Sequence, residues 1–304
     1  MIEKMYEVAG HVFCLSMPEN SDVWAKLDNY APFELLHPAG LGENVAFRCE
    51  LCDELPSGTP QLYYKDNPVE ADFPCIDIFR QADGLLFEMR PARRSNLVFR
   101  LWTTSDFTAG FLQKWTDGNV GRFPVDNALM LMYAMRTTGM DTLEMHASVT
   151  VKDGRGYLFL GESGTGKSTH SRMWLENIPG SRLLNDDNPI IRVGEDGTVR
   201  VYGSPWSGKT SCYLNDSCPV GGFVRIRQYP SNEISRLSVL ESYSELLSSC
   251  SGMKMNDNMV DAMHATFEKV LGTVPFWLMK CLPDGDAARV CYEKVKNGDS
   301  DSAE

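Results

Sequence analysis

The sequence predicts an α/β fold with α+β character, in which a β-rich N-terminal lobe precedes a phosphate-loop (P-loop) domain built on a mixed sheet. Three observations support this prediction. Residues 161–168 fit the pattern G-x-x-x-x-G-K-[ST] between a short apolar strand and a helix start. Asp153-Gly154, a hairpin turn signal, lies directly before that strand. The length of 304 residues is typical of about two domains.

The chain is expected to have three parts. Residues 1–122 form the N-terminal lobe, whose role the sequence does not disclose, residues 123–296 form a nucleotide-binding domain, and residues 297–304 form a disordered acidic tail. In the lobe, β-branched and aromatic runs predict strands at 45–49, 76–79, 85–89 and 96–102. Asp83-Gly84 is the expected hairpin turn between the second and third of these.

A helix over residues 125–136, with leucines and methionines on one face, is the expected junction between the two domains. The second domain then alternates short strands and helices. Strands are predicted at 146–151, 157–160, 190–193, 198–202, 223–227 and 276–279, and helices at 167–176, 238–249, 259–271 and 286–295. Because the turn at Asp153-Gly154 is tight, the strand that enters the loop is expected to pair antiparallel with the one before it. In the common nucleotide-binding α/β fold its neighbours are parallel.

Composition and charge limit the classes of partner. The net charge of −12 disfavours a nucleic acid or an anionic membrane, whose phosphates repel such a surface. No run of about 18 apolar residues predicts a membrane span, and the N-terminus lacks the pattern of an export signal. The nine cysteines, including the lone pair Cys49 and Cys52, are expected to be free thiols, which predicts a cytoplasmic protein.

The loop itself predicts nucleotide binding. Gly161, Gly164 and Gly166 let backbone N–H groups turn toward phosphate oxygens, and the following helix directs its positive end at the same anion. Lys167 is expected to reach the β- and γ-phosphates, and the Ser168 hydroxyl to bind Mg²⁺. The residues expected to bind the nucleotide are Gly161, Glu162, Ser163, Gly164, Thr165, Gly166, Lys167, Ser168 and Thr169.

An acid pair follows the loop at Asp186-Asp187. One carboxylate is expected to hold the metal with Ser168, and the other to accept a proton from a hydroxyl group. Adjacent side chains of a strand point to opposite faces, so the two acids serve one site only if the backbone bends there. Pro189 favours such a bend by moving Asn188 away from helical conformation. The alternative is a solvated acidic turn.

Two further features leave alternatives open. In the loop 203–209, Trp206 could stack on a base and Lys209 could meet a phosphate, or the Pro-Trp pair could be a hydrophobic plug. Arg225 and Arg227 alternate with apolar residues of one strand. They could stabilise a transition state, but an exposed strand face is the favoured interpretation.

The set of motifs resembles the HPr kinase/phosphorylase family, whose nucleotide fold is shared with phosphoenolpyruvate carboxykinase. That family has a strand with a histidine, a hairpin, a G-x-S-G-x-G-K-S loop and a downstream Asp-Asp pair. The matching residues here are His146, the turn at Asp153-Gly154, Gly161 to Ser168, and Asp186-Asp187. The resemblance covers residues 141–295. Thr169 stands where HPr kinases have glutamate, and their glycine-rich signature is altered, so the chain resembles HPr kinase-like proteins rather than a true HPr kinase.

The resemblance implies an ATP- and Mg²⁺-dependent phosphotransferase that moves the γ-phosphate to a hydroxyl of a small molecule or a protein serine. It implies that His146 lies near the phosphates, that Asp186 or Asp187 is the general base, and that Lys167 stabilises the transferred group. It also implies a possible homo-oligomer. The alternative is a nucleotide-binding ATPase-type switch that has no acceptor substrate. The acceptor itself is not encoded in any motif.

Overall fold

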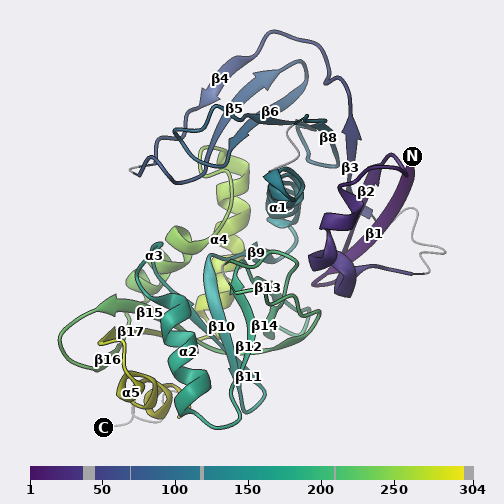
Figure 1. Cartoon of the computed structure of the whole chain (residues 1–304). Coiled ribbons are helices and arrows are strands. Elements are labelled where there is room, and N and C mark those ends of the chain that lie inside the picture. The colour runs from purple at the N-terminus through teal and green to yellow at the C-terminus, as the bar shows by residue number, and fades with distance from the viewer. Residues whose placement is uncertain (37–44, 69, 117–119, 209, 298–304) are drawn as a thin grey trace. The chain divides into compact units, whose positions relative to one another are not determined.

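The computed structural model describes residues 1–36, 45–68, 70–116, 120–208 and 210–297 (Figure 1). It is a mixed α/β protein with two mixed sheets and few helices. The chain divides into two compact units, Met1–Arg136 and Thr137–Glu304. The sequence placed this boundary at 122/123. Of the tail expected at 297–304, only the first residue lies within the described part of the chain.

The N-terminal unit contains one large sheet, two short 3₁₀ helices and most of one α-helix. Its elements are β1 Ile2–Val8, β2 His11–Met17, η1 Trp24–Lys26, η2 Asp28–Phe33, β3 Val45–Cys52, β4 Gln61–Tyr64, β5 Cys75–Gln81, β6 Gly84–Arg90, β7 Phe99–Thr104, β8 Ala109–Gln113 and α1 Phe123–Thr137. The strand order is β1-β2-β3-β8-β7-β6-β5-β4. The pairs β2–β3 and β3–β8 are parallel, so the sheet is mixed.

Helix α1 packs within this unit. A Cβ on Gly110 of β8 would collide with the sulfur of Met132, so this glycine lets the helix approach the strand closely. Tyr133 Oη donates to the Val8 carbonyl oxygen over 3.0 Å. The helix thus belongs to the N-terminal unit, which explains why the boundary lies at 136/137.

The hairpin expected at Asp83-Gly84 is present with a shift of one residue. β5 and β6 are antiparallel with Gln81 opposite Gly84, so the two turn residues are Ala82 and Asp83. Ala82 takes φ of 53°, in the left-handed region. Gly84 instead begins a strand, where a side chain would collide with Trp102.

The C-terminal unit is built on a nine-stranded sheet. Its elements are β9 Thr142–Glu144, β10 Ala147–Lys152, β11 Arg155–Leu160, α2 Lys167–Asn177, β12 Arg182–Asp187, β13 Ile190–Val193, β14 Val199–Tyr202, β15 Ser217–Gln228, β16 Glu233–Arg236, α3 Val239–Ser249, α4 Asp257–Leu271, β17 Phe276–Cys281 and α5 Gly285–Val295. The order is β12-β10-β11-β15-β14-β13-β9, with β17 paired to β15 and β16 to β17.

The predicted hairpin before the loop is confirmed. β10 and β11 pair antiparallel from Ala147 opposite Leu160 to Lys152 opposite Arg155. On its other side β11 pairs in parallel with β15, and β15 pairs in parallel with β17. The strand that enters the loop therefore has one antiparallel and one parallel neighbour.

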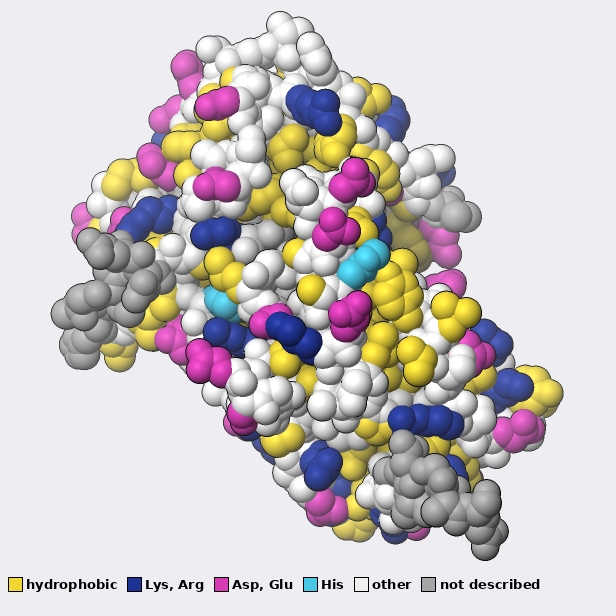
Figure 2. Space-filling view, turned by 180° about the vertical axis from the view of Figure 1, so that it is seen from behind, with side chains coloured by type: hydrophobic (Ala, Val, Ile, Leu, Met, Phe, Trp, Pro, Cys, Tyr) yellow, Lys and Arg dark blue, Asp and Glu magenta, His cyan; other side chains and the backbone are white. Residues whose placement is uncertain are grey.

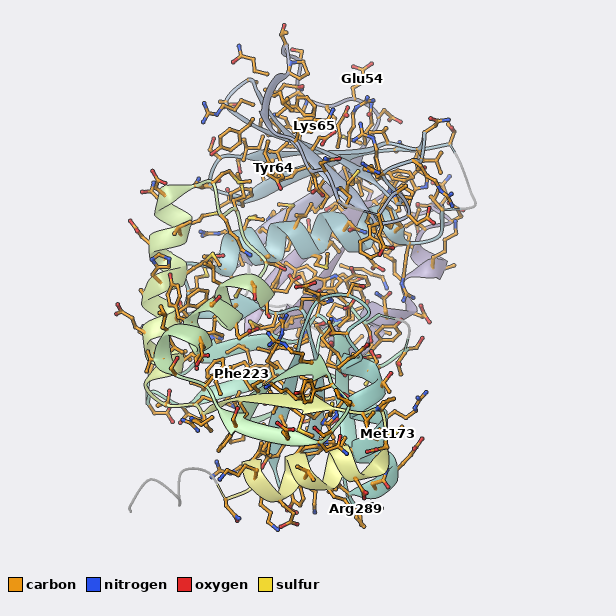
Figure 3. All side chains as sticks on the ribbon, turned by 90° about the vertical axis from the view of Figure 1, so that its left-hand side faces the viewer. Glu54, Tyr64, Lys65, Met173, Phe223 and Arg289 are labelled. Carbon is orange, nitrogen blue, oxygen red and sulfur yellow. The ribbon has the colours of Figure 1, made fainter. Side chains whose placement is uncertain are left out.

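Two apolar cores cover the two faces of this sheet, because alternate strand residues point to opposite sides. Leu158 and Leu160 of β11 pack with Phe267 of α4 on one side. Tyr157 and Phe159 of the same strand pack with residues of α2 and α5 on the other. Phe223 of β15, which is labelled in Figure 3, stacks on Phe276 of β17 with ring centroids 4.4 Å apart.

Candidate functional site

The phosphate-loop motif connects β11 to α2, at the strand-to-helix position that the sequence predicts. β11 ends at Leu160, Gly166 precedes the helix, and α2 begins at Lys167. Gly161 and Gly166 have φ of 154° and 107°. A Cβ on Gly161 would also collide with Thr165. Both positions favour glycine, and the loop surrounds a helix N-terminus, where an anion is stabilised.

The nine residues expected to bind the nucleotide differ in accessibility. Glu162, Ser163, Gly164 and Ser168 are exposed, Thr165, Gly166 and Thr169 are half-buried, and Gly161 and Lys167 are buried. Thr165 Oγ1 donates to the carbonyl oxygen of Glu162 over 2.8 Å. This bond closes the tip of the loop and leaves the Ser168 hydroxyl accessible.

The Lys167 side chain lies under the loop. Its Nζ donates to the carbonyl oxygens of Gly161 and Glu162 over 2.8 and 3.3 Å and lies 3.0 Å from Nε2 of His146. Burial lowers the pKa of Lys167. Since these three contacts are two carbonyl oxygens and an imidazole, the ammonium would gain from an anionic ligand.

His146, which directly precedes β10, lies between this lysine and the acid pair. Its Nε2 is 3.3 Å from Asp187 Oδ1 as well as 3.0 Å from Lys167 Nζ. An ammonium group only donates, so one imidazole nitrogen cannot accept from Lys167 and donate to Asp187 at once. The tautomer of His146 therefore selects between two hydrogen-bond arrangements.

The acid pair ends β12, and both carboxylates act on one ammonium. Asp187 and Asp186 each raise the pKa of Lys167, against the larger effect of burial. Asp186 is 3% exposed, whereas the Asp187 side chain is 39% exposed. Asp187 has φ of 155°, and the N–H of Asn188 donates back to Asn185 Oδ1 over 3.0 Å. The expected bend is present, and the burial of Asp186 excludes a fully solvated acidic turn.

The segment after β14 holds this bend in place. Ser204 Oγ donates to the Asn188 carbonyl oxygen over 2.6 Å and accepts from Asn185 Nδ2 over 3.2 Å. The N–H of Gly208 donates to the Asp186 carbonyl oxygen over 2.6 Å. A strained backbone at Asp187 persists because several bonds around it fix the chain.

Oxygen donors near the loop fit a magnesium ion. No group of three or more His, Cys, Asp and Glu side chains in the described residues could hold a metal by itself. Mg²⁺ in phosphate sites binds through one or two carboxylates together with phosphate oxygens and water. Ser168, Asp186 and Asp187 offer a hydroxyl and carboxylates, which is the donor set that such a site needs.

Arg225 belongs to this region, which corrects the expectation of an exposed strand face. It lies opposite Leu160 in the parallel pairing of β15 with β11. Its guanidinium bonds Glu245 over 3.0 Å, lies 3.7 Å from Glu162, and is 16% exposed. Arg227, two residues further on, is exposed as expected. The register of β11 with β15 would have revealed Arg225, but no local motif does.

Glu144, at the end of β9, is a second residue that the sequence did not indicate. Burial raises the pKa of Glu144 to about 8, and the nearby charge of Asp187 adds to this. Ser251 Oγ donates to one carboxyl oxygen over 3.3 Å, while Oε2 has no hydrogen-bond partner in the described part of the chain. Burial and the charge of Asp187 therefore both favour the protonated form of this carboxyl group.

The remaining candidates from the sequence are the residues of the 203–209 loop and the cysteines. Trp206 is 3% exposed, which favours the hydrophobic plug over a platform for a base. Lys209 lies outside the described residues. All nine cysteines are free, as expected, and burial raises the pKa of Cys49 to about 12.

Comparisons with known proteins give a weak structural likeness. No family model matches the chain, and no curated protein matches it. Among solved structures, the chain is similar to the Hpr(Ser) kinase/phosphatase from Coxiella burnetii, at 13% identity. The match covers 52% of this chain and 95% of that one, with a TM-score of 0.28. A TM-score of this size does not establish a shared fold.

The described surface carries acidic and basic side chains that are mixed on the face shown in Figure 2. On the face seen in Figure 2, described acidic and basic side chains are interspersed rather than gathered by sign. Within the described residues, no helix combines the length and the apolar character that crossing a membrane requires.

Proposed function

We propose that this chain is an HPr kinase-like phosphotransferase that uses ATP and Mg²⁺ to phosphorylate a hydroxyl group of a small molecule or a protein serine. One observation carries the proposal. Lys167 Nζ lies 3.0 Å from His146, and His146 lies 3.3 Å from Asp187. Three separate segments of the chain thus converge beside a phosphate loop, and each contributes a group that phosphoryl transfer uses.

The roles of these residues follow from their surroundings. The loop amides and Lys167 bind the phosphates and stabilise negative charge as it develops. Asp187 is the better candidate for the general base, because its side chain is 39% exposed and an acceptor hydroxyl can reach it. Asp186 is buried and suits a fixed position beside the metal. His146 orients Asp187 or holds a proton beside it.

Ser168 with Asp186 or Asp187 would hold the Mg²⁺ ion. The chemistry that the ion supplies is neutralisation of phosphate charge. Arg225 adds a cation on the same side of the loop, since it shares the electrostatic surroundings of Lys167 and lowers the pKa of that lysine.

The test uses γ-labelled ATP with the full chain, Mg²⁺ and fractionated cell extract. The proposal expects label to reach an acceptor, and expects Asp187→Asn to lower this transfer by about a hundredfold or more while ATP still binds. Asp186→Asn should lower transfer as well, with a changed requirement for Mg²⁺. The matched control is Asp196→Asn, which replaces an exposed aspartate of a distant hairpin.

The outcome of this assay separates the proposal from its rival. Release of free phosphate without any labelled acceptor would identify an ATPase-type switch. Unchanged transfer in both aspartate variants would contradict the assigned roles.

A further inference from the structure

A cavity of about 470 Å³ opens on the β15–β17 side of the loop, whereas the acid pair ends β12 on the other side of β11 in the sheet. It begins at Gly164, Thr165 and Gly166 of the loop and continues along α2 past Thr169 and Met173. Its volume lies within the range of small-molecule sites. Any ligand whose phosphates bind the loop therefore has this space directly beside it. Figure 3 marks Met173 on α2.

The loop fixes which end of a nucleotide points toward the cavity. In a phosphate loop the lysine contacts the β- and γ-phosphates, so the γ-phosphate lies on the side of its ammonium. Here that ammonium lies beside His146. The α-phosphate, and the nucleoside attached to it, must then lie toward Gly164–Gly166, where the cavity begins.

Among the described residues, the lining of the cavity is mostly apolar and contains no acidic or basic side chain apart from one histidine. Met173, Ile226 and Leu282 supply apolar walls, and Tyr229 supplies an aromatic ring that is 43% exposed. None of the described residues that line it is Asp, Glu, Lys or Arg. Its histidine, His170, is buried, and its Nε2 accepts a hydrogen bond from Trp174 Nε1 over 3.2 Å, so that nitrogen carries no proton. A second anionic substrate would find no counter-charge here, whereas a flat, uncharged heterocycle would be well accommodated.

The walls are held in position before any ligand binds. Asn232 Nδ2 donates to Asp284 over 3.0 Å, and Asn232 Oδ1 accepts from the N–H of Leu282 over 2.9 Å. The N–H of Tyr229 donates to the Cys281 carbonyl oxygen over 3.0 Å. These bonds join the two segments that follow β15 and β17, and a preorganised site loses less entropy on binding.

We infer that this cavity binds the base and ribose of the nucleoside triphosphate whose phosphates occupy the loop. The inference rests on the proposed function, because it takes the phosphates to lie at Gly161–Ser168. It assigns to Tyr229 the role of a stacking surface and to Met173 that of an apolar wall. It leaves the opposite side of the loop to the acceptor.

The test compares two ligands of the full chain by calorimetry in the presence of Mg²⁺. ATP carries the nucleoside, whereas inorganic tripolyphosphate offers the phosphates alone. Met173→Trp fills the cavity and Tyr229→Ala removes the ring. Leu175→Trp is the matched control, because Leu175 is an exposed residue of α2 that does not line the cavity.

The wild type should bind ATP roughly tenfold or more tightly than tripolyphosphate. Met173→Trp and Tyr229→Ala should each weaken ATP binding by roughly tenfold and leave tripolyphosphate binding within about twofold. Leu175→Trp should change neither. Lys167→Ala should weaken both ligands, which separates the loop from the cavity.

Other results would overturn the inference in distinguishable ways. Equal affinity of the wild type for both ligands, or ATP binding unchanged in both cavity variants, would remove the base site and leave the loop's role intact. Equal loss of both ligands in the cavity variants would show a structural effect and contradict the assignment. A wild type that binds neither ligand would overturn the proposed function and this inference together.

Discussion

The two sides of the phosphate loop differ in almost every physical property. On one side, Lys167, His146 and Asp187 form a chain of contacts of 3.0 and 3.3 Å. On the other side, Met173 and Tyr229 line a cavity with no charged residue among the described residues of its wall. The same short segment therefore separates a charged region from an apolar one.

The periodicity of two elements produces this difference. Thr169 and Met173 lie four residues apart on one face of α2, and both line the cavity together with Gly166, which precedes the helix. In β15, Arg225 bonds Glu245, whereas its neighbour Ile226 lines the cavity. A ligand that spans the loop would have its reacting end in the charged region and its binding end in the apolar one.

Among the substitutions considered, removal of the Lys167 side chain should weaken ATP binding the most. Lys167→Ala should weaken ATP binding by about a hundredfold, which corresponds to about 2–3 kcal/mol for contacts between a charged group and phosphate. The fold should be retained, because burial already lowers the pKa of this ammonium and so opposes its charged form. Calorimetry and thermal melts measure the two quantities.

Lys280→Ala is the control from the apolar side. Lys280 Nζ lies 5.1 Å from the ring centre of Tyr229, near the cavity and not in its wall. Its loss should weaken ATP binding by no more than about threefold, because this half-buried ammonium lies outside the cavity wall. Equal effects of the two lysine substitutions would contradict the division of the loop into two sides.

The buried acid behind the charged side should give stability a specific pH dependence. The pKa of Glu144 is raised from 4.5 to about 8, so the folded chain keeps a proton that the unfolded chain releases. The stability that protonated Glu144 contributes to the folded chain is fully present below about pH 4.5 and is lost as the pH rises through about 8. Glu144→Gln should flatten this decline and raise the unfolding free energy at pH 7 by about 2 kcal/mol.

Denaturant melts at several pH values measure this effect. Glu195→Gln, at an exposed turn position, is the matched control and should leave the pH profile unchanged. If Glu144→Gln and the wild type had the same dependence of unfolding free energy on pH, Glu144 would not hold an extra proton in the folded state.

Substitution of the two arginines of β15, Arg225 and Arg227, should have the smallest effect on the free energy of unfolding. Arg225→Ala leaves Glu245 without the guanidinium 3.0 Å away and should lower the unfolding free energy by about 1 kcal/mol. Arg227→Ala, on the exposed neighbour, should change it by less than about 0.5 kcal/mol. Equal unfolding free energies of the two variants would contradict the claim that Arg225 is held by an ion pair while Arg227 is not.

The loop and its hairpin could be predicted because short-range chemistry specifies them. Asp153-Gly154 fixes the turn between β10 and β11, and the glycines of the loop fix its backbone. β1 was not predicted, since Glu3, Lys4 and Glu7 interrupt its apolar pattern. β2 was missed as well, although it is nearly all buried.

The sequence predicted only those residues of the candidate site that belong to a local motif. Arg225 and Glu144 join the charged side through pairings between segments far apart in the sequence, and no local pattern encodes those pairings. The cavity is assembled from the loop, α2 and the segments after β15 and β17, and each contributes residues that are unremarkable by themselves.

A crystal structure of the chain with Mg²⁺ and a non-hydrolysable ATP analogue tests the central claim most directly. We expect the γ-phosphate within hydrogen-bond distance of Lys167 Nζ, on the side of His146 and Asp187, and the base in the cavity against Tyr229. An analogue bound with its phosphates away from Gly161–Ser168 would contradict the proposed function. Phosphates in the loop with the base on the His146 side would contradict the division between the two sides.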